Sequence, residues 1–433
     1  MFDSQAAFAL LKIVLTFGIM LFAISRHWHL WLAILLGGVI IGLLFGMAPL
    51  RIAVVAGTSL VQPEAMALFG VVFFIMLLSA IQGKTGQGRR LVAGLTPYMK
   101  SPRLRLAFFP ALVGLLSVPG GAIFSCPMVR DVAEGYSIPK RDQALINYWF
   151  RHIWESVWPL YPGYIMTCVL ADIPPSILWR YTFPTVFFSC FIGWALFLRI
   201  PIEQLPQLAL QETEKRPLHI VLLDALPLIV GIGTAPLFGL LLSALGFDAP
   251  GGTAFCLAFA LAAVTAMIQD KVPPSAIPGL MLTPHVGKML GLILMIFVFK
   301  EILTEAKVVE ALAAIFSGKS AVLLLTLTLP ALMGALTGLM LGFVGSAFPI
   351  VLAVISQAGM WDERLCWVIV AIASGHFGQM VSPMHSCYLV TLEFFREHFH
   401  STWKPVFFGS VIQIACTGLY AAALYFLISP LLP

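Results

Sequence analysis

Long apolar stretches with few or no charged side chains follow one another along almost the whole chain. A helix needs roughly 20 mostly apolar residues to cross a bilayer, and only helices or closed barrels satisfy the backbone there. Of the 433 residues 60% are hydrophobic and 10% charged, too few charges to cover the surface of a water-soluble protein. The sequence therefore predicts an all-α polytopic membrane protein and excludes a soluble enzyme and a nucleic-acid-binding protein.

We expect about ten helices to cross the membrane. Two of the apolar stretches are too long for one crossing and carry proline near the middle, at Trp158-Pro159 and at Ser382-Pro383. Proline removes a backbone donor and clashes with the preceding turn, so both spans are predicted to break inside the membrane. The expected full spans are 8–24, 29–48, 66–83, 177–198, 219–243, 252–268, 286–303 and 406–429, and the broken ones are 143–171 and 364–394.

Two further apolar stretches, 104–133 and 320–358, are each divided by a Gly-rich segment. Each is predicted to form a re-entrant hairpin, two half-length helices that enter and leave the membrane on the same side. The tips of these hairpins are expected at 117–125 and 337–346.

Lysine and arginine are distributed unevenly between the two sides of this topology. With residue 84 in the cytoplasm, only Arg51, Arg180, Lys307, Lys319 and Arg364 fall on the opposite side. Because basic residues are enriched in cytoplasmic loops, this asymmetry supports the assignment. We expect a multi-pass protein of the inner, cytoplasmic membrane with both termini outside, on the periplasmic side.

The two halves of the chain share short patterns in the same order. Residues 109–114 (FPALVG) are similar to 329–334 (LPALMG), and a seven-residue step from histidine to proline occurs at 152–159 and at 376–383. Each half has five expected crossings, an odd number, so the halves must lie inverted in the membrane. Inverted repeats with broken helices are typical of secondary transporters. The expected units are a first inverted repeat at 1–205, a cytoplasmic linker at 206–218 and a second repeat at 219–433.

These motifs resemble the ten-span family called domain of unknown function 401, which is similar to the ion transporter superfamily of secondary carriers. The resemblance covers nearly the whole chain and rests on 117–125 (SVPGGAIFS), 150–163 (FRHIWESVWPLYPG) and 375–383 (GHFGQMVSP). It implies a homodimer with a fixed scaffold and a mobile transport domain that moves like an elevator. The chain lacks the Ser-Asn-Thr tip signature of the dicarboxylate carriers in that superfamily, which argues against citrate or succinate as substrate.

The hairpin tips and the breaks supply the candidate substrate-binding residues. Glycine lets the backbone approach a ligand closely, and a helix N-terminus favours an anion. The alternative is that glycine and serine only permit tight helix packing in lipid. The candidates are Ser117, Gly120, Gly121, Ser125, Arg151, Trp158, Pro159, Thr337, Gly345, Ser346, Ser382 and Pro383.

Ionisable residues at membrane depth supply the candidates for ion or proton coupling, because such groups are expensive unless they are paired or wetted. Arg151 and Glu155 are four residues apart, so they could instead neutralise each other. Histidines at these positions could equally be hydrogen-bonded core residues. The coupling candidates are His152, Glu155, His376 and His385, with H⁺ or Na⁺ as the coupling ion and no other cofactor.

We therefore expect a secondary active transporter for a small, anionic, carboxylate-type organic solute, embedded in the lipid bilayer as a homodimer, with no nucleic-acid partner. The alternatives are an ion/H⁺ antiporter, a channel or an intramembrane enzyme. The enzyme would hold a metal through His152 and Glu155, with His376 and His385 completing the site. No HExxH motif occurs, and the seven cysteines lie in or beside apolar runs without a CxxC pair, so we expect neither catalysis nor a bound metal.

Overall fold

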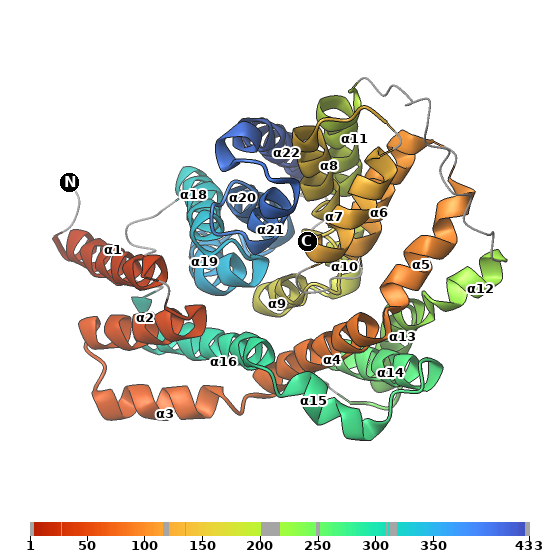
Figure 1. The fold of residues 1–433 in the computed structure, drawn as a ribbon. Coiled ribbons are helices and arrows are strands. Elements are labelled where there is room, and N and C mark those ends of the chain that lie inside the picture. Colours follow the sequence, from red (N-terminus) through yellow and green to blue (C-terminus); the bar gives the residue numbers. More distant parts are fainter. Residues whose placement is uncertain are drawn as a thin grey trace.

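The computed structural model describes residues 4–26, 28–99, 101–115, 121–134, 136–200, 217–247, 252–308, 311 and 318–428. The regular elements of these residues are all helices, so the predicted fold class is confirmed (Figure 1). The predicted linker falls outside the described residues except for its last two positions.

The chain forms the following helices: α1 (Ser4–Ser25), α2 (Leu30–Leu44), α3 (Pro49–Ser59), α4 (Pro63–Thr85), α5 (Gln87–Leu95), α6 (Pro102–Leu115), α7 (Ala122–Ala133), α8 (Lys140–Arg151), α9 (Pro162–Ala171), α10 (Pro175–Thr182), α11 (Pro184–Gly193), α12 (Leu218–Leu223), α13 (Leu226–Ala244), α14 (Thr253–Gln269), α15 (Ile277–Met281), α16 (Pro284–Glu305), α18 (Lys319–Thr337), α19 (Met340–Gln357), α20 (Arg364–Met380), α21 (Ser386–Phe395) and α22 (Phe399–Ile428). Proline occupies the first or second position of many of them, where its missing N–H and fixed φ do no harm.

Six helices in the described part of the chain are long and apolar enough to cross a membrane. A seventh candidate, α14, is bent by 111° from the short helical segment that follows it, Pro274–Met281. Together with their composition, these helices make the chain a multi-pass membrane protein. The six are Pro63–Thr85, Pro175–Leu198, Leu226–Ala244, Lys319–Thr337, Met340–Gln357 and Phe399–Leu427.

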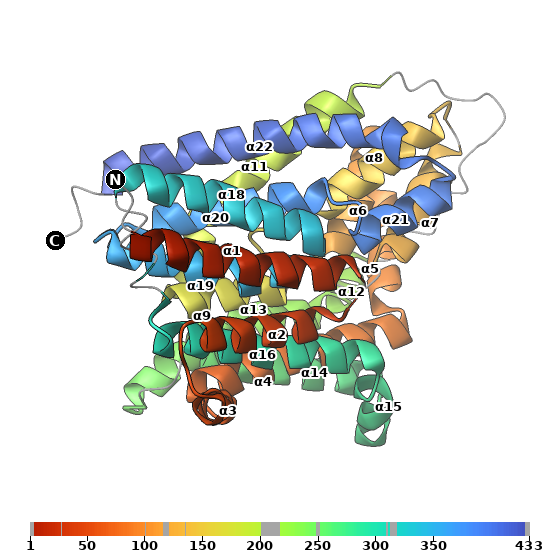
Figure 2. The ribbon, with the colours of Figure 1, turned by 90° about the vertical axis from the view of Figure 1, so that its left-hand side faces the viewer.

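The helices form two groups that face each other, as Figures 1 and 2 show. The first, which we call the α4–α16 layer, consists of α2, α3, α4, α13, α14 and α16, each packed on a neighbour within the set. The second, the central body, consists of α6–α11 and α18–α22. The layer meets the body where α4 contacts α9 and where α16 contacts α19.

Small residues bring the helices of the layer close together. A Cβ added to Gly38 of α2 would lie 3.3 Å from Ile302 of α16, and one added to Gly42 would lie 3.2 Å from the same side chain. Without a side chain at these positions the two backbones approach closely, which is how membrane helices gain packing energy in lipid.

Two glycines at matching positions of the repeated pattern hold α6 against α8 and α18 against α20. A Cβ on Gly114 would overlap the carbonyl oxygen of Arg151, and a Cβ on Gly334 would overlap the carbonyl oxygen of Gly375. Arg151 and Gly375 each precede the histidine of the repeated His-to-Pro step. The two halves therefore make the same helix contact with the same residue type.

The two hairpin segments differ in length. In the first, α6 has 14 residues and α7 has 12, and their tip at 116–120, with Ser117 and Gly120, lies outside the described residues. In the second, α18 has 19 residues and α19 has 18, so each arm is long enough to cross a membrane. The expectation of half-length arms is wrong for this hairpin. The reason is that no charged residue occurs between Lys319 and Asp362, so nothing ends the apolar arms early.

The turn of the second hairpin packs against the backbone of the second break. Gly338 between α18 and α19 has φ +62°, a left-handed conformation that favours glycine. A Cβ here would also lie 2.8 Å from the backbone nitrogen of His385. Gly338 is thus required for two reasons, the left-handed turn and the close approach to the backbone of His385.

Candidate functional site

Both spans that contain a central proline lose helical structure there. The chain leaves helix between the end of α8 at Arg151 and the start of α9 at Pro162, and again between Met380 and Ser386. The first break begins at His152, six residues earlier than expected. Short-range bonds explain the early start, because the amides of His152 and Glu155 bond to carbonyl oxygens three residues back instead of four. His152 and Glu155 therefore lie in the break itself and not on the helix that leads into it.

A cavity of about 170 Å³ lies between the α4–α16 layer and the central body. The layer contributes an apolar wall that includes Ile75 and Met76 of α4 and Met289 of α16. The polar lining comes mainly from the central body, and especially from the two breaks. The polar and ionisable lining residues are Ser79, Arg151, His152, Glu155, Tyr161, His285, His385, Ser386 and Cys387.

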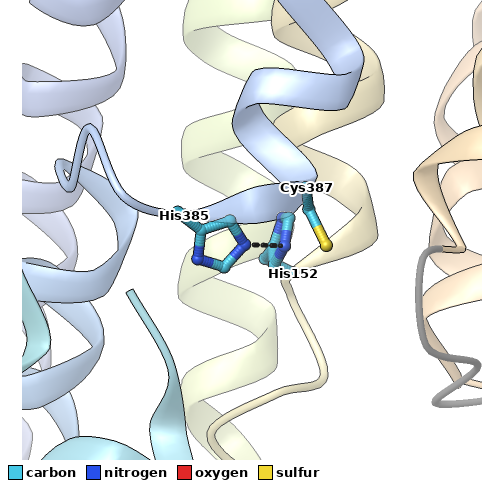
Figure 3. Close-up of side chains that lie close together, drawn as sticks. All are labelled: His152, His385 and Cys387. Atoms are coloured by element: carbon cyan, nitrogen blue, oxygen red, sulfur yellow. Dashed lines mark hydrogen bonds between the residues drawn. The ribbon is translucent and has the colours of Figure 1, made fainter. Parts of the chain in front are cut away.

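Two histidines, one from each break, face each other at this cavity (Figure 3). Nε2 of His152 lies 3.0 Å from Nε2 of His385, and Nδ1 of His152 lies 2.6 Å from the carbonyl oxygen of Tyr148. A carbonyl oxygen can only accept, so Nδ1 of His152 carries the proton and Nε2 presents its lone pair. His385 is therefore the donor in the pair of imidazoles.

Two charged side chains are buried beside the histidines. Arg151 is 5% exposed and Glu155 is 8% exposed. One guanidinium nitrogen, Nη1 of Arg151, donates to Sγ of Cys387 at 3.0 Å, and Oε2 of Glu155 lies 4.0 Å from Nε2 of His152. Buried ionisable groups at membrane depth are costly and mark pathways for ions or substrates.

Three helices begin at the wall of the cavity. Pro162 and Gly163 open α9, Met340 and Leu341 open α19, and Ser386 and Cys387 open α21. The first N–H groups of a helix have no partner within it, and the helix dipole places positive charge at this end. A Cβ on Gly163 would lie 3.0 Å from the backbone nitrogen of Leu341, so the starts of α9 and α19 are in close contact.

Among the candidates from the sequence, Arg151, His152, Glu155 and His385 line this cavity together. Most of the hydroxyl candidates instead bond to nearby backbone. Thr337 donates to the carbonyl oxygen of Met333, Ser346 to that of Gly342, and Ser382 to that of Ala335.

The remaining candidates lie in packed surroundings. Gly345 allows α19 to pack against Ile296 of α16, Ser125 is fully buried on α7, and Trp158 packs on the core. Gly121 precedes α7, and Pro159 and Pro383 lie inside the breaks.

His376 lies away from the main cavity, in contact with two small ones. Each has a volume of about 10 Å³, close to the least space that holds one water molecule. His152 lines the first small cavity as well as the main one, and Gln413 lines both small ones. Buried polar atoms without a hydrogen-bond partner among the described residues gather here, on His376, Ser410, Gln413 and Thr417.

Sequence reasoning missed Cys387, Tyr161 and His285. Cys387 follows His385 by two residues, a spacing that could have identified it as part of the second break. Tyr161 donates to the carbonyl oxygen of Gly114 at 2.7 Å, so it ties the first break to α6. Its position between Pro159 and Pro162 could likewise have identified it as part of the first break.

Comparison with known proteins agrees with this architecture. The crystal structure of the YdaH transporter from Alcanivorax borkumensis, described as having an unusual topology, superposes with a TM-score of 0.61. The match covers 87% of this chain and 89% of that one at 13% identity, so the two proteins share a fold. No curated protein matches the sequence. The model of the family described as "Protein of unknown function (DUF401)" matches residues 8–424, and the chain therefore belongs to the DUF401 family.

Proposed function

We propose that this protein is a secondary active transporter that carries a small organic anion across the inner membrane, coupled to protons. The observation that carries this proposal is the cavity between the central body and the α4–α16 layer, where one buried arginine and three helix N-termini meet. The fold that this protein shares with a transporter also supports a transport function.

The lining favours an anion when Glu155, its one carboxylate, carries a proton. Arg151 supplies a full positive charge, and α9, α19 and α21 each direct an N-terminus at the cavity. Transporters with broken helices bind anionic groups at such ends, near the middle of the membrane. The volume of about 170 Å³ is below the range of roughly 300–1,000 Å³ for sites that bind drug-sized ligands. A small carboxylate fits this volume and this charge.

The donor atoms at the cavity favour H⁺ over Na⁺ as the coupling ion. Hard cations are bound by several oxygen ligands, often carboxylates, whereas the lining offers a single carboxylate beside three hydroxyl groups, three imidazoles and one thiol. Imidazole binds a proton in the physiological range. His152 is our leading proton carrier, and Glu155 is the second.

The small cavities extend this polar region towards α22. His152 lines both the main cavity and the first small cavity, and His376 lines both small ones. One water molecule in each would give the unpartnered atoms of His376, Ser410 and Gln413 a partner. We propose this row of groups as the route by which a proton reaches His152.

Alternating access would come from movement of the central body against the α4–α16 layer. Four helices at expected spans, α2, α4, α14 and α16, pack together in this layer, and we propose them as the scaffold. The substrate cavity lies at the boundary, so a shift of the central body would expose it to one side and then the other. We propose that the layer forms the homodimer and that the central body moves like an elevator.

The matched contacts of Gly114 and Gly334 support an inverted-repeat origin of this body. Helices from the two halves also interleave there, since α21 packs on α7 and α8 and α19 packs on α9. In an inverted repeat of this kind, the two breaks would exchange roles between the outward-facing and inward-facing states.

The experiment is a thermal-shift screen of carboxylates, amino acids and phosphonates on the purified protein, followed by uptake of the best ligand into proteoliposomes. We expect a small anion to stabilise the wild-type protein and to accumulate, with saturable rates, when a proton gradient is imposed. Rates that do not saturate would indicate a channel, and conversion of the ligand to a product would indicate an enzyme.

A further inference from the structure

The facing histidines and Cys387 form a cluster of donor atoms that suits a metal ion as well as a proton. The donor atoms of His152, His385 and Cys387 all lie within 4.8 Å of one another. Imidazole nitrogen and thiolate sulfur are the ligands that Zn²⁺ prefers in proteins. We propose that this cluster is a binding site for a Zn²⁺-type transition-metal ion.

The first imidazole is already held as a metal ligand would be. Nδ1–H of His152 donates to the carbonyl oxygen of Tyr148 at 2.6 Å, which fixes the ring and directs the lone pair of Nε2 at His385. Metal-binding histidines almost always donate their other ring N–H to such an acceptor. Figure 3 shows the two rings facing each other and the Cys387 side chain beside His152.

The spacing of the donor atoms is close to that of a tetrahedral site. Two nitrogens bound to one Zn²⁺ at about 2.05 Å lie about 3.3 Å apart. The two Nε2 atoms are 3.0 Å apart, so a small opening of the pair admits the ion. Binding requires His385 to carry its proton on Nδ1, which has no hydrogen-bond partner among the described residues, and it releases the thiol proton of Cys387 to solvent.

A fourth ligand is available at the same place. Oε2 of Glu155 lies 4.0 Å from Nε2 of His152 and has no hydrogen-bond partner in the described part of the chain. With Cys387 as a thiolate, the thiolate and the carboxylate balance the two charges of the ion. Arg151 donates to the sulfur at 3.0 Å and would remain as an outer contact that orients this ligand.

The position of the site gives the ion a route of entry and a structural effect. The three ligand residues line the cavity of about 170 Å³, so an ion that enters this cavity reaches them directly. His152 belongs to the first break, and His385 and Cys387 belong to the second break and the start of α21. A bound ion therefore joins the two halves of the chain. It occupies the lone pair that the transport proposal assigns to a proton, but its binding does not depend on transport.

Co²⁺ is the probe for the test, because it takes the place of Zn²⁺ and its spectrum reports its ligands. Purified wild-type protein in detergent is titrated with Co²⁺. We expect a near-ultraviolet thiolate-to-metal charge-transfer band, intense visible bands of tetrahedral Co²⁺, and loss of both when Zn²⁺ is added. Cys387→Ser should remove the charge-transfer band, and His385→Gln should weaken binding more than tenfold.

Matched controls separate this site from other thiols and imidazoles. Cys416→Ser on α22 and His400→Gln, whose side chain is exposed, should leave the titration unchanged. If Cys387→Ser fails to fold, alkylation of native Cys387 measured by mass spectrometry replaces it, and Zn²⁺ should slow that alkylation more than tenfold. A wild-type titration without a charge-transfer band, a band that persists in Cys387→Ser, or alkylation that Zn²⁺ does not slow would each overturn the proposal. None of these results bears on uptake, which is measured separately.

Discussion

Substituting Gly114 by alanine tests the contact that positions the first break. A Cβ at this position would overlap the carbonyl oxygen of Arg151 and lie 3.0 Å from its carbonyl carbon, whereas ordinary contact begins at 3.4 Å. The obstacle is backbone, which cannot turn aside as a side chain can, so α6 and α8 must separate. Overpacking of this kind destabilises proteins by about 1–3 kcal/mol, or roughly 5- to 150-fold in the ratio of folded to unfolded protein.

The matched control is Gly233→Ala in α13, where an added Cβ meets nothing within 4 Å. There, alanine should be neutral or stabilising by about 0.5–1 kcal/mol, because glycine is a poor helix former. Unfolding in detergent, followed by tryptophan fluorescence during heating and during titration with sodium dodecyl sulfate, gives both values.

Gly334→Ala extends the test to the second half, because Gly334 meets the carbonyl oxygen of Gly375 in the same way. We expect losses of similar size for Gly114→Ala and Gly334→Ala, and no loss for Gly233→Ala. If Gly114→Ala were as stable as the control, the close packing of α6 on α8 would be refuted, along with the account of how Arg151 and His152 are positioned.

Three further predictions concern the site and the topology. Arg151→Met should weaken binding of an anion identified by the thermal-shift screen by tenfold or more, because a hydrogen bond to a charged group contributes about 1.5–3 kcal/mol, and Arg151→Lys should recover part of the loss in an equilibrium binding assay. Ser125→Ala, which the sequence alone suggests would weaken binding, should leave affinity for the same anion unchanged, since Ser125 is buried on α7 and is not part of the cavity lining; a tenfold loss would return this residue to the site. A cysteine placed at position 2 of a variant without native cysteines should react with an impermeant maleimide added to intact cells, and labelling only after lysis would reverse the predicted topology.

The helical class of this chain could be predicted because apolar stretches of membrane length dominate the sequence. The existence of both breaks could also be predicted, because proline within an apolar helix removes a backbone donor, although the first break begins six residues before the expected Trp158-Pro159. The length of the second hairpin could not, since a Gly-rich centre shows where the chain turns and not how far its arms extend. Its arms reach 19 and 18 residues in a stretch that no charge interrupts between Lys319 and Asp362.

The ionisable part of the site was predictable for a physical reason. Arg151, His152, Glu155 and His385 stand out because charge at membrane depth requires a function or a partner. Serine and threonine cannot be identified as site residues in this way, because in helices their hydroxyl groups commonly bond to the backbone of the preceding turn. Thr337 makes such a bond here. Cys387 was missed because a cysteine in an apolar stretch looks the same in the sequence as a buried core residue.

The most direct test of proton-coupled transport through the first break is uptake into proteoliposomes under an imposed proton gradient. The anion identified by the thermal-shift screen is supplied to wild-type protein, to His152→Gln and to Glu155→Gln, with His400→Gln as the exposed-histidine control. The account predicts accumulation by the wild type and by the control that a protonophore abolishes, and loss of gradient-driven accumulation in His152→Gln, in Glu155→Gln or in both. Gradient-driven accumulation retained by both variants would contradict the account and make sodium the better candidate for the coupling ion.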